Sequence, residues 1–336
     1  MMLFVLSAES PAQTLAKNVS NAGTTAATFL EIPVGAAAVG MGGAFVSLAN
    51  DGSALYWNVA GSALLPKSEV IIVHTNWIAD SKFDFAGLVL PLGSFGTLGF
   101  SLTSLSMGDM KVRTVEMPDG TGEFFSAGDL AGAVSYSRTL TDRFAVGMTL
   151  KYIQQRIWHE SASAFAVDIG TLFRTDLFGG MVIGASLSNF GTRMQMAGRD
   201  TRYFIRLDPS KTGSNDRIPS NIEMDTWDLP LLFQLGVSTD VVKSDANRWT
   251  VTVDALHPSD NYESLNVGTE VVFEEFLFLR GGYKSLFLND AEGGMSFGVG
   301  VKSSALFSGP SLSFDYAYRD FGRLVNIQVF SLSIRF

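Results

Sequence analysis

The side chains able to do chemistry are sparse and form no catalytic pattern. The histidines, His74, His159 and His257, are far apart in the chain and lack metal-ligand spacing. His159 lies between Trp158 and Glu160 in an expected loop, where a solvated residue is the simplest interpretation. The chain has no cysteine, which excludes thiol chemistry and a disulfide framework. We therefore expect no enzyme, no metal and no cofactor.

Short runs of glycine and serine resemble nucleotide-binding or nucleophile motifs only superficially. The run 40–43 lacks the third glycine of a dinucleotide loop, and no βαβ pattern follows it. The run 300–303 fails the phosphate-loop spacing, and the run 184–188 lacks the final glycine of a nucleophile elbow. These runs do not change the expectation that the protein is not an enzyme.

Charged residues inside otherwise apolar segments are more informative. Lys151 and Asp168 lie on one predicted hairpin, and Glu270 and Arg280 lie on another. Simple registers place the members of each pair roughly opposite each other on the inward face. Because an unpaired buried charge is costly, we expect two ion pairs. They would either line a polar pathway or neutralise a filled interior, and we prefer the second interpretation.

The composition indicates a membrane protein without transmembrane helices. Only 17% of the 336 residues are charged, the mean hydropathy is +0.22, and 34 glycines accompany 26 phenylalanines. The longest uncharged run, 85–108, is broken by Pro91 and Gly96. An apolar chain without helical spans is typical of a membrane β-barrel. The net charge of −9 argues against nucleic acid as a partner.

Alternating hydrophobicity predicts the strands of this barrel. Segments of about 10–13 residues, the length of tilted membrane strands, recur to the last residue. Fourteen are expected, near 68–79, 82–92, 96–107, 129–139, 143–156, 163–174, 180–191, 229–240, 247–258, 262–273, 276–286, 292–302, 310–320 and 325–336. The predicted fold is all-β, an antiparallel transmembrane β-barrel of about 14 strands, and an even number suits a bacterial barrel. With both ends periplasmic, the long connections 108–128 and 192–228 fall on the extracellular side.

The alternation also predicts which side chains face lipid. Outward positions at the periplasmic strand ends are repeatedly aromatic: Phe144, Phe173, Trp249, Phe273 and Phe336. Such a girdle indicates a membrane interface, whereas a soluble β-sandwich would scatter its aromatic residues. The final segment places four apolar residues on one face, as in the C-terminal signal of outer-membrane barrels: Phe330, Leu332, Ile334 and Phe336. The expected partners are therefore outer-membrane lipid and the barrel-assembly machinery.

The stretch before the first strand, residues 35–67, is apolar and rich in glycine. Glycines at 40, 42 and 43 permit tight turns, and short helical turns are expected at 44–48 and 54–57. Asp51 or Ser53 would cap the second turn. We predict a short helical plug inside the barrel, with an ordinary buried helix-turn-helix as the alternative. Upstream, residues 1–12 are interpreted as the remnant of a signal peptide and 13–34 as an N-terminal lead-in that is flexible over 13–28. The barrel itself is predicted over 68–336.

The run 37–61 resembles the N-terminal signature of the PorV/PorQ family of outer-membrane proteins, relatives of the FadL-like channels. The similar features are Gly40-Met41-Gly42-Gly43-Ala44-Phe45, Asn50-Asp51 and Asn58-Val59-Ala60-Gly61. FadL-like plugs usually carry a proline where this chain has Val59. Further stretches also resemble the PorV-like pattern: 119–125, 140–144, 151–155, 166–170, 188–191 and 280–284. The resemblance implies that the plug is shaped by Gly40, Gly42, Gly43, Asn50, Asp51, Asn58 and Ala60.

The resemblance implies a part in type IX secretion at the outer membrane of a Gram-negative type of bacterium. Such a barrel binds secreted cargo proteins and carries them from the translocon to the cell surface. The alternatives are a FadL-like passive transporter of hydrophobic compounds and a structural or adhesin-anchoring barrel. The loop 192–228 is polar, whereas the loop 108–128 offers apolar side chains for contact with a partner protein: Met110, Val112, Phe124 and Phe125. This contrast favours a protein-docking surface over an apolar catchment.

Overall fold

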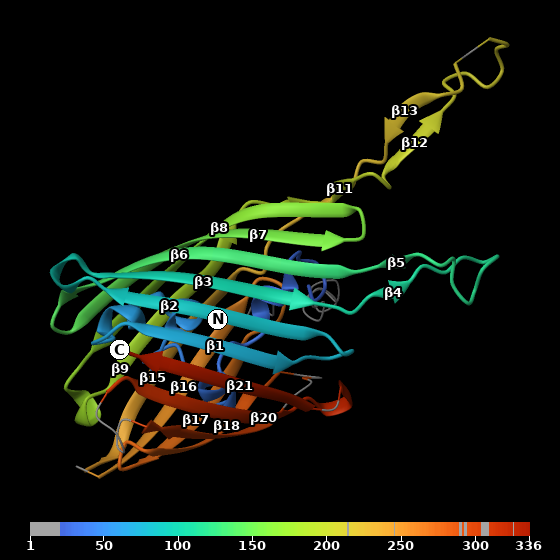
Figure 1. Cartoon of the computed structure of the whole chain (residues 1–336). Helices are drawn as coiled ribbons and strands as arrows, with labels where there is room; N and C mark the ends of the chain where they lie inside the picture. Colours follow the sequence, from blue (N-terminus) through green and yellow to red (C-terminus); the bar gives the residue numbers. More distant parts are fainter. Residues whose placement is uncertain are drawn as a thin grey trace, which may run out of the picture.

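The protein forms a closed barrel of fourteen antiparallel strands around a short N-terminal plug (Figure 1). The computed structural model describes residues 21–213, 215–244, 246–288, 291, 294–303, 309–324 and 326–336, so the predicted signal peptide lies outside the described residues. The barrel strands are β1 (Glu69–Asn76), β2 (Lys82–Pro91), β3 (Thr97–Ser106), β6 (Ala127–Thr141), β7 (Phe144–Ile157), β8 (Glu160–Arg174), β9 (Val182–Gly191), β15 (Leu232–Lys243), β16 (Asn247–Pro258), β17 (Ser264–Phe273), β18 (Leu277–Leu286), β19 (Met295–Lys302), β20 (Ser311–Asp320) and β21 (Asn326–Arg335). The predicted fold class and the number of strands are confirmed.

Strands adjacent in the chain are neighbours in the barrel, and the first and last strands close it. β1 pairs with β21 in a register that places Glu69 opposite Arg335. The turns on the side of the C-terminus are short, and the connections 107–126 and 192–231 on the other side are long. Among the described residues, no helix is long and apolar enough to cross a membrane.

Both long connections contain short strands that project from the barrel (Figure 1). In the first connection β4 (Met110–Lys111) pairs with β5 (Phe124–Phe125). The second connection carries β10 (Met194–Gln195), β11 (Ala197–Gly198), β12 (Arg202–Ile205), β13 (Ile218–Asn221) and β14 (Thr226–Trp227). β12 pairs only with β13 among the described residues, so this hairpin extends away from the barrel wall.

The alternating pattern of β7 shows how the sequence defines the two faces. Thr149 points into the lumen and is fully buried, whereas Met148 points outward and is 56% exposed. Phe144 lies at the periplasmic end of β7, and Tyr152 packs against Phe165 of β8 near the other end. With about 3.4 Å per residue and a tilt of about 40°, the interval from Phe144 to Tyr152 spans about 21 Å along the membrane normal. This height is close to the apolar band of an outer-membrane barrel.

The plug fills the middle of the lumen with four short helices. They are η2 (Thr28–Glu31), α2 (Ala36–Gly40), α3 (Ala54–Trp57) and η3 (Val59–Leu64). Met41, Phe45 and Val46 form a plug core and are at most 1% exposed. The last residues of the predicted lead-in 13–34 pack inside the barrel, because Phe29 and Val34 are also buried. These buried side chains extend the plug upstream of residue 35.

Candidate functional site

Backbone contacts hold the first part of the plug against the barrel wall. Gly42 and Gly43 have φ of +68° and +78°, conformations that glycine adopts without strain. A Cβ on Gly42 would lie 2.7 Å from the amide nitrogen of Tyr283 in β18, so a side chain there has no space. Gly40 faces Gly298 of β19 in the same way. The predicted plug glycines therefore lie at positions where the plug and the wall touch.

Glycines of the wall make the matching space, and the sequence analysis overlooked them. A Cβ on Gly282 would lie 2.2 Å from the nitrogen of Gly42, and one on Gly184 would lie 2.5 Å from the carbonyl oxygen of Val46. Glycine inside a strand marks close approach of another backbone. Its recurrence at inward positions of several strands is the sequence signal that would have identified the plug-facing wall.

Carboxylates of the wall hold the plug from two sides. Asp254 of β16 is fully buried, and its Oδ2 accepts hydrogen bonds from the backbone N–H groups of Phe45 and Val46, at 2.8 and 2.9 Å. Glu69 of β1 accepts a hydrogen bond from the backbone N–H of Gly52 at 2.8 Å. Both carboxylates satisfy N–H groups of plug turns that have no helical partner, so they are anchors that the sequence analysis did not identify.

The predicted polar residues of the plug have different roles. Asn58 donates to the carbonyl oxygens of Val46 and Thr171, which ties the plug to β8. Asp51 accepts from the backbone N–H of Ser53 at 2.8 Å, and Ser53 makes no side-chain cap, so the expected cap is replaced by a local Asx turn. Two further predicted residues differ in exposure: Ala60 is fully buried, whereas Asn50 lies at the periplasmic edge of the plug.

Both predicted ion pairs are present on the lumen face. Lys151 Nζ lies 2.6 Å from Asp168 Oδ2, and Arg280 Nε lies 2.8 Å from Glu270 Oε2. Glu270 and Arg280 are directly opposite in register, but Lys151 pairs with Asp168 diagonally, because Thr149 is the residue opposite Asp168. Arg280 also lies 2.6 Å from a third partner, the carboxylate of Asp315.

A cavity of about 1200 Å³, the outer cavity, lies on the extracellular side of the plug. Its lining is mixed: apolar side chains include Phe29, Leu105 and a contact between Trp77 and Phe321 whose ring centroids are 5.5 Å apart, and polar side chains supply a similar area. Burial raises the pKa of the Glu31 carboxyl in this lining to about 7, with a further increase from Asp260 and a decrease from Lys284. The cavity therefore combines aromatic walls with a few buried ionisable groups.

The outer cavity continues inward into a smaller one. This inner cavity has a volume of about 200 Å³, and both cavities are lined by Glu31, Tyr262 and Lys284. Its other wall includes Leu232 at the start of β15 and Asn189 near the end of β9. The two cavities thus form a path from the extracellular side to the junction of β9 and β15.

The barrel wall is incomplete at this junction. Backbone pairing between β9 and β15 ends at Ser188 and Leu232. Beyond this point the segment after β9 and the segment before β15 pair again only at Met194 and Trp227. In the described chain no backbone hydrogen bond joins 189–193 to 228–231, and we call these facing stretches the β9–β15 seam. β9 instead continues along β8 to its last residue. The seam therefore lies at the depth of the outer aromatic residues of β7 and β8.

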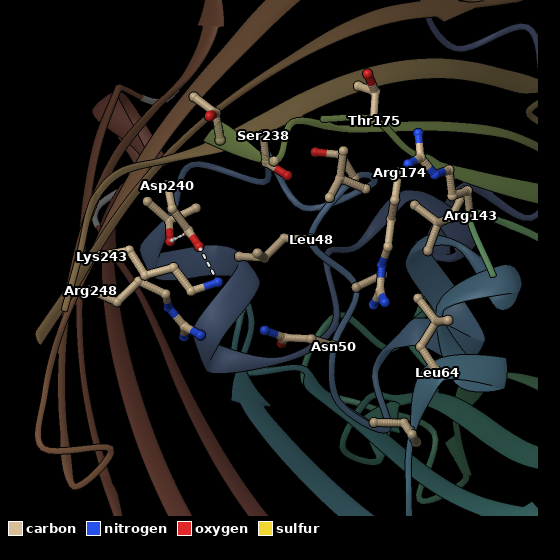
Figure 2. A pocket seen from close by; sticks show the side chains of 18 of the residues that line it. Leu48, Asn50, Leu64, Arg143, Arg174, Thr175, Ser238, Asp240, Lys243 and Arg248 are labelled. Carbon is tan, nitrogen blue, oxygen red and sulfur yellow. Dashed lines mark hydrogen bonds and ion pairs between the residues drawn. The ribbon is translucent and has the colours of Figure 1, made fainter. Parts of the chain in front are cut away.

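A different cavity, the periplasmic vestibule, lies on the opposite side of the plug (Figure 2). It has a volume of about 790 Å³, and Leu48 and Leu64 of the plug face it. Several charged side chains lie at its rim, among them Arg174, Lys243 and Arg248. The vestibule carries more charged side chains than the outer cavity, whose wall includes several aromatic rings.

The residues predicted for partner binding lie on the β4–β5 hairpin. Phe124 is 57% exposed, but Phe125 is half-buried and packs against Trp158 at a ring distance of 6.2 Å. Met110 and Val112 are also half-buried. Phe124 is therefore the member of this set most available to a partner. At the other end of the barrel, Phe330, Leu332 and Ile334 share the lipid-facing side of β21, and the predicted fourth residue, Phe336, follows the strand and is exposed.

The histidines belong to surface pairs and not to a catalytic centre. His74 lies 2.7 Å from Asp84, His159 lies 2.8 Å from Asp200, and His257 lies 3.1 Å from a glutamate. In the part of the chain that the structure describes, no three side chains of His, Asp or Glu are grouped to hold a metal ion.

Comparison with protein families gives one match. Residues 4–156 match the model of an uncharacterised protein family, UPF0164. No curated protein matches the sequence.

Solved structures give a clearer result for the fold. The toluene transporter TbuX of Ralstonia pickettii matches with a TM-score of 0.56 at 12% identity, covering 90% of this chain and 98% of that one. The toluene transporter TodX of Pseudomonas putida matches with a TM-score of 0.55 at 12% identity, over 90% and 96%. A FadL homologue of Pseudomonas aeruginosa matches with a TM-score of 0.52 at 13% identity, over 91% and 98%. The chain thus has the fold of FadL-type barrels and is an outer-membrane protein.

Proposed function

We propose that the protein is a passive transporter of small apolar molecules across the outer membrane. The observation that carries this proposal is the connected pair of cavities, which leads from the extracellular side to the β9–β15 seam. The toluene transporters named above share the fold, and their names agree with this class of solute.

The outer cavity suits weak capture of an apolar solute. Burying about 150 Å² of a molecule the size of a phenyl ring contributes about 4 kcal/mol. This free energy corresponds to a dissociation constant of about 1 mM, which permits rapid release. Aromatic rings such as Trp77 and Phe321 supply the contact surface. A passive carrier needs such weak and reversible contacts.

The seam is the better exit for such a solute. Passage toward the periplasm would lead past the buried plug core and into the vestibule, where charged side chains such as Arg174, Lys243 and Arg248 gather. Transfer of an apolar molecule into water is unfavourable. Release through the seam would deliver it to the lipid, since the seam lies at the depth of Tyr152 and Phe165.

Uptake of labelled toluene by vesicles containing the protein tests the proposal. Leu105→Asp places a charge in the outer cavity and is expected to reduce uptake by at least tenfold. The control, Val115→Asp, adds the same charge at a loop residue that is 99% exposed, and its uptake is expected to match the wild type. Equal uptake by vesicles with and without the protein would contradict the proposal.

A second candidate function is that of a cargo carrier in type IX secretion. The projecting hairpins support this candidate. The β4–β5 hairpin presents Phe124 to solvent, and a few such anchors supply most of the affinity of a protein interface. Phe124→Ala combined with Phe125→Ala would then weaken cargo binding by about 2–4 kcal/mol. Phe95→Ala, at a 78% exposed phenylalanine of a periplasmic turn, is the matched control. Retention of cargo in the periplasm by the double variant alone would favour this candidate, and unchanged secretion would reject it.

A further inference from the structure

Three polar side chains converge where the inner cavity meets the β9–β15 seam. Lys151 Nζ lies 2.6 Å from Asp168 Oδ2 and donates to Asn189 Oδ1 at 2.9 Å. Asp168 Oδ1 accepts from the backbone N–H of Asn189 at 2.8 Å. The three residues are 8%, 5% and 4% exposed, respectively. Backbone pairs normally close a barrel wall, and they are missing at the seam. The side-chain network lies where they would be.

The chemistry of the neighbours fixes the orientation of the Asn189 amide. A lysine ammonium only donates hydrogen bonds, so the amide oxygen must face Lys151. The amide NH₂ then faces across the seam and donates to the carbonyl oxygen of Pro230 at 3.0 Å. A carbonyl oxygen only accepts, which makes this assignment self-consistent. Pro230 has no N–H of its own with which to extend the ladder of β15.

The backbone at Asn189 is shaped for this role. Its φ is +64°, a left-handed conformation that asparagine tolerates better than most residues. The register between β8 and β9 shifts between Val167 and Ile169, opposite this position. The resulting bulge turns the Asn189 side chain out of the β-ladder and toward Pro230.

We propose that Lys151, Asp168 and Asn189 form a latch that closes the β9–β15 seam beside the inner cavity. Lys151 and Asp168 position Asn189, and the bond from Asn189 to Pro230 joins the two sides there, while an exposed ion pair between Arg193 and Asp228 joins them at the outer end of the seam. Breaking this bond removes the tie beside the inner cavity and loosens the seam there toward the lipid, with the Arg193–Asp228 pair left in place. The use of the latch in solute release rests on the proposed function, but its existence does not.

Two substitutions of Asn189 distinguish the effect of losing its hydrogen bond to Pro230 from the effect of losing its side-chain volume. Asn189→Gly keeps the left-handed backbone and removes the amide. Asn189→Asp keeps the volume, but an ionised carboxylate cannot donate to the Pro230 carbonyl and repels Asp168. Asn266→Ala is the control, since Asn266 is a buried asparagine that lines the same cavity from β17.

The opening is measured with a reporter cysteine, because the chain has none of its own. Ser188→Cys places a thiol on the wall of the inner cavity, next to the seam. Each variant, folded as judged by heat-dependent gel mobility, is reconstituted in lipid and treated with a lipid-soluble maleimide. Loss of one hydrogen bond is expected to raise the labelling rate about fivefold in both Asn189 variants and to leave the Asn266 control unchanged.

A wild-type labelling rate in Asn189→Asp would overturn the proposal. If only Asn189→Gly were labelled faster, the increase would come from the lost side-chain volume and not from the lost hydrogen bond, which would also overturn the proposal. Toluene uptake by the same vesicles is recorded in parallel. Faster labelling without protein-dependent uptake would leave the latch supported and contradict the transport function, so the two failures are distinguishable.

Discussion

Replacing Asp254 with alanine is expected to loosen the plug without opening the barrel wall. The Asp254 carboxylate is fully buried and accepts hydrogen bonds from the backbone N–H groups of Phe45 and Val46. Each hydrogen bond to a charged group contributes about 1.5–3 kcal/mol, so their loss destabilises plug docking by about 3–6 kcal/mol. The two N–H groups are then left buried without partners, which favours displacement of the plug.

The assay is the conductance of single barrels in a planar lipid bilayer. Asp254→Ala is expected to show frequent open events that the wild type lacks. Ser331→Ala removes one neutral hydrogen bond, to the N–H of Ala36, and serves as a graded comparison with a cost of about 1 kcal/mol. Both variants should keep the heat-dependent gel mobility of the folded barrel. A folded Asp254→Ala protein with the conductance of the wild type would refute the assignment of Asp254 as a plug anchor.

Three further perturbations test other parts of the account. Gly282→Ala should destabilise the protein by about 1–3 kcal/mol in urea unfolding, because the new methyl overlaps the plug, whereas Gly132→Ala, with open space around it, should not. Phe336→Asp should lower the amount of inserted barrel while Phe95→Ala does not, and equal amounts would argue against a C-terminal assembly signal. The Glu31 pKa is raised from 4.5 to about 7 by burial, so the folded state retains the proton and the docking of its turn weakens as the pH rises through this window. Hydrogen exchange of the turn Thr28–Glu31, corrected for intrinsic rates, should show less protection at pH 8 than at pH 5, and Glu31→Gln should remove the difference.

The strands were predictable because one physical constraint acts on all of them. A membrane wall demands alternating outward apolar residues, so even the isolated charges Lys151 and Asp168 could be assigned to the lumen face. Their diagonal contact was not predictable, because it depends on register, and a bulge lies beside Asp168.

The plug and the passages were harder to predict from the sequence. The anchors Asp254 and Glu69 are single carboxylates in ordinary strand patterns, and only the folded plug shows which N–H groups they satisfy. The seam arises where β9 follows β8 and leaves β15, a long-range choice that local periodicity does not encode. The hydrogen bond from Asn189 to Pro230 could not be predicted either, because it forms only where the two strands separate.

The most direct test of the transport path is the position of a bound solute. Crystals of the protein soaked with bromobenzene would show the bromine by anomalous scattering. We predict bromine sites in the outer cavity near Trp77 and in the inner cavity between Asn189 and Leu232. Bromine confined to the periplasmic vestibule, or absent from both extracellular-side cavities at saturating solute, would contradict the proposed path.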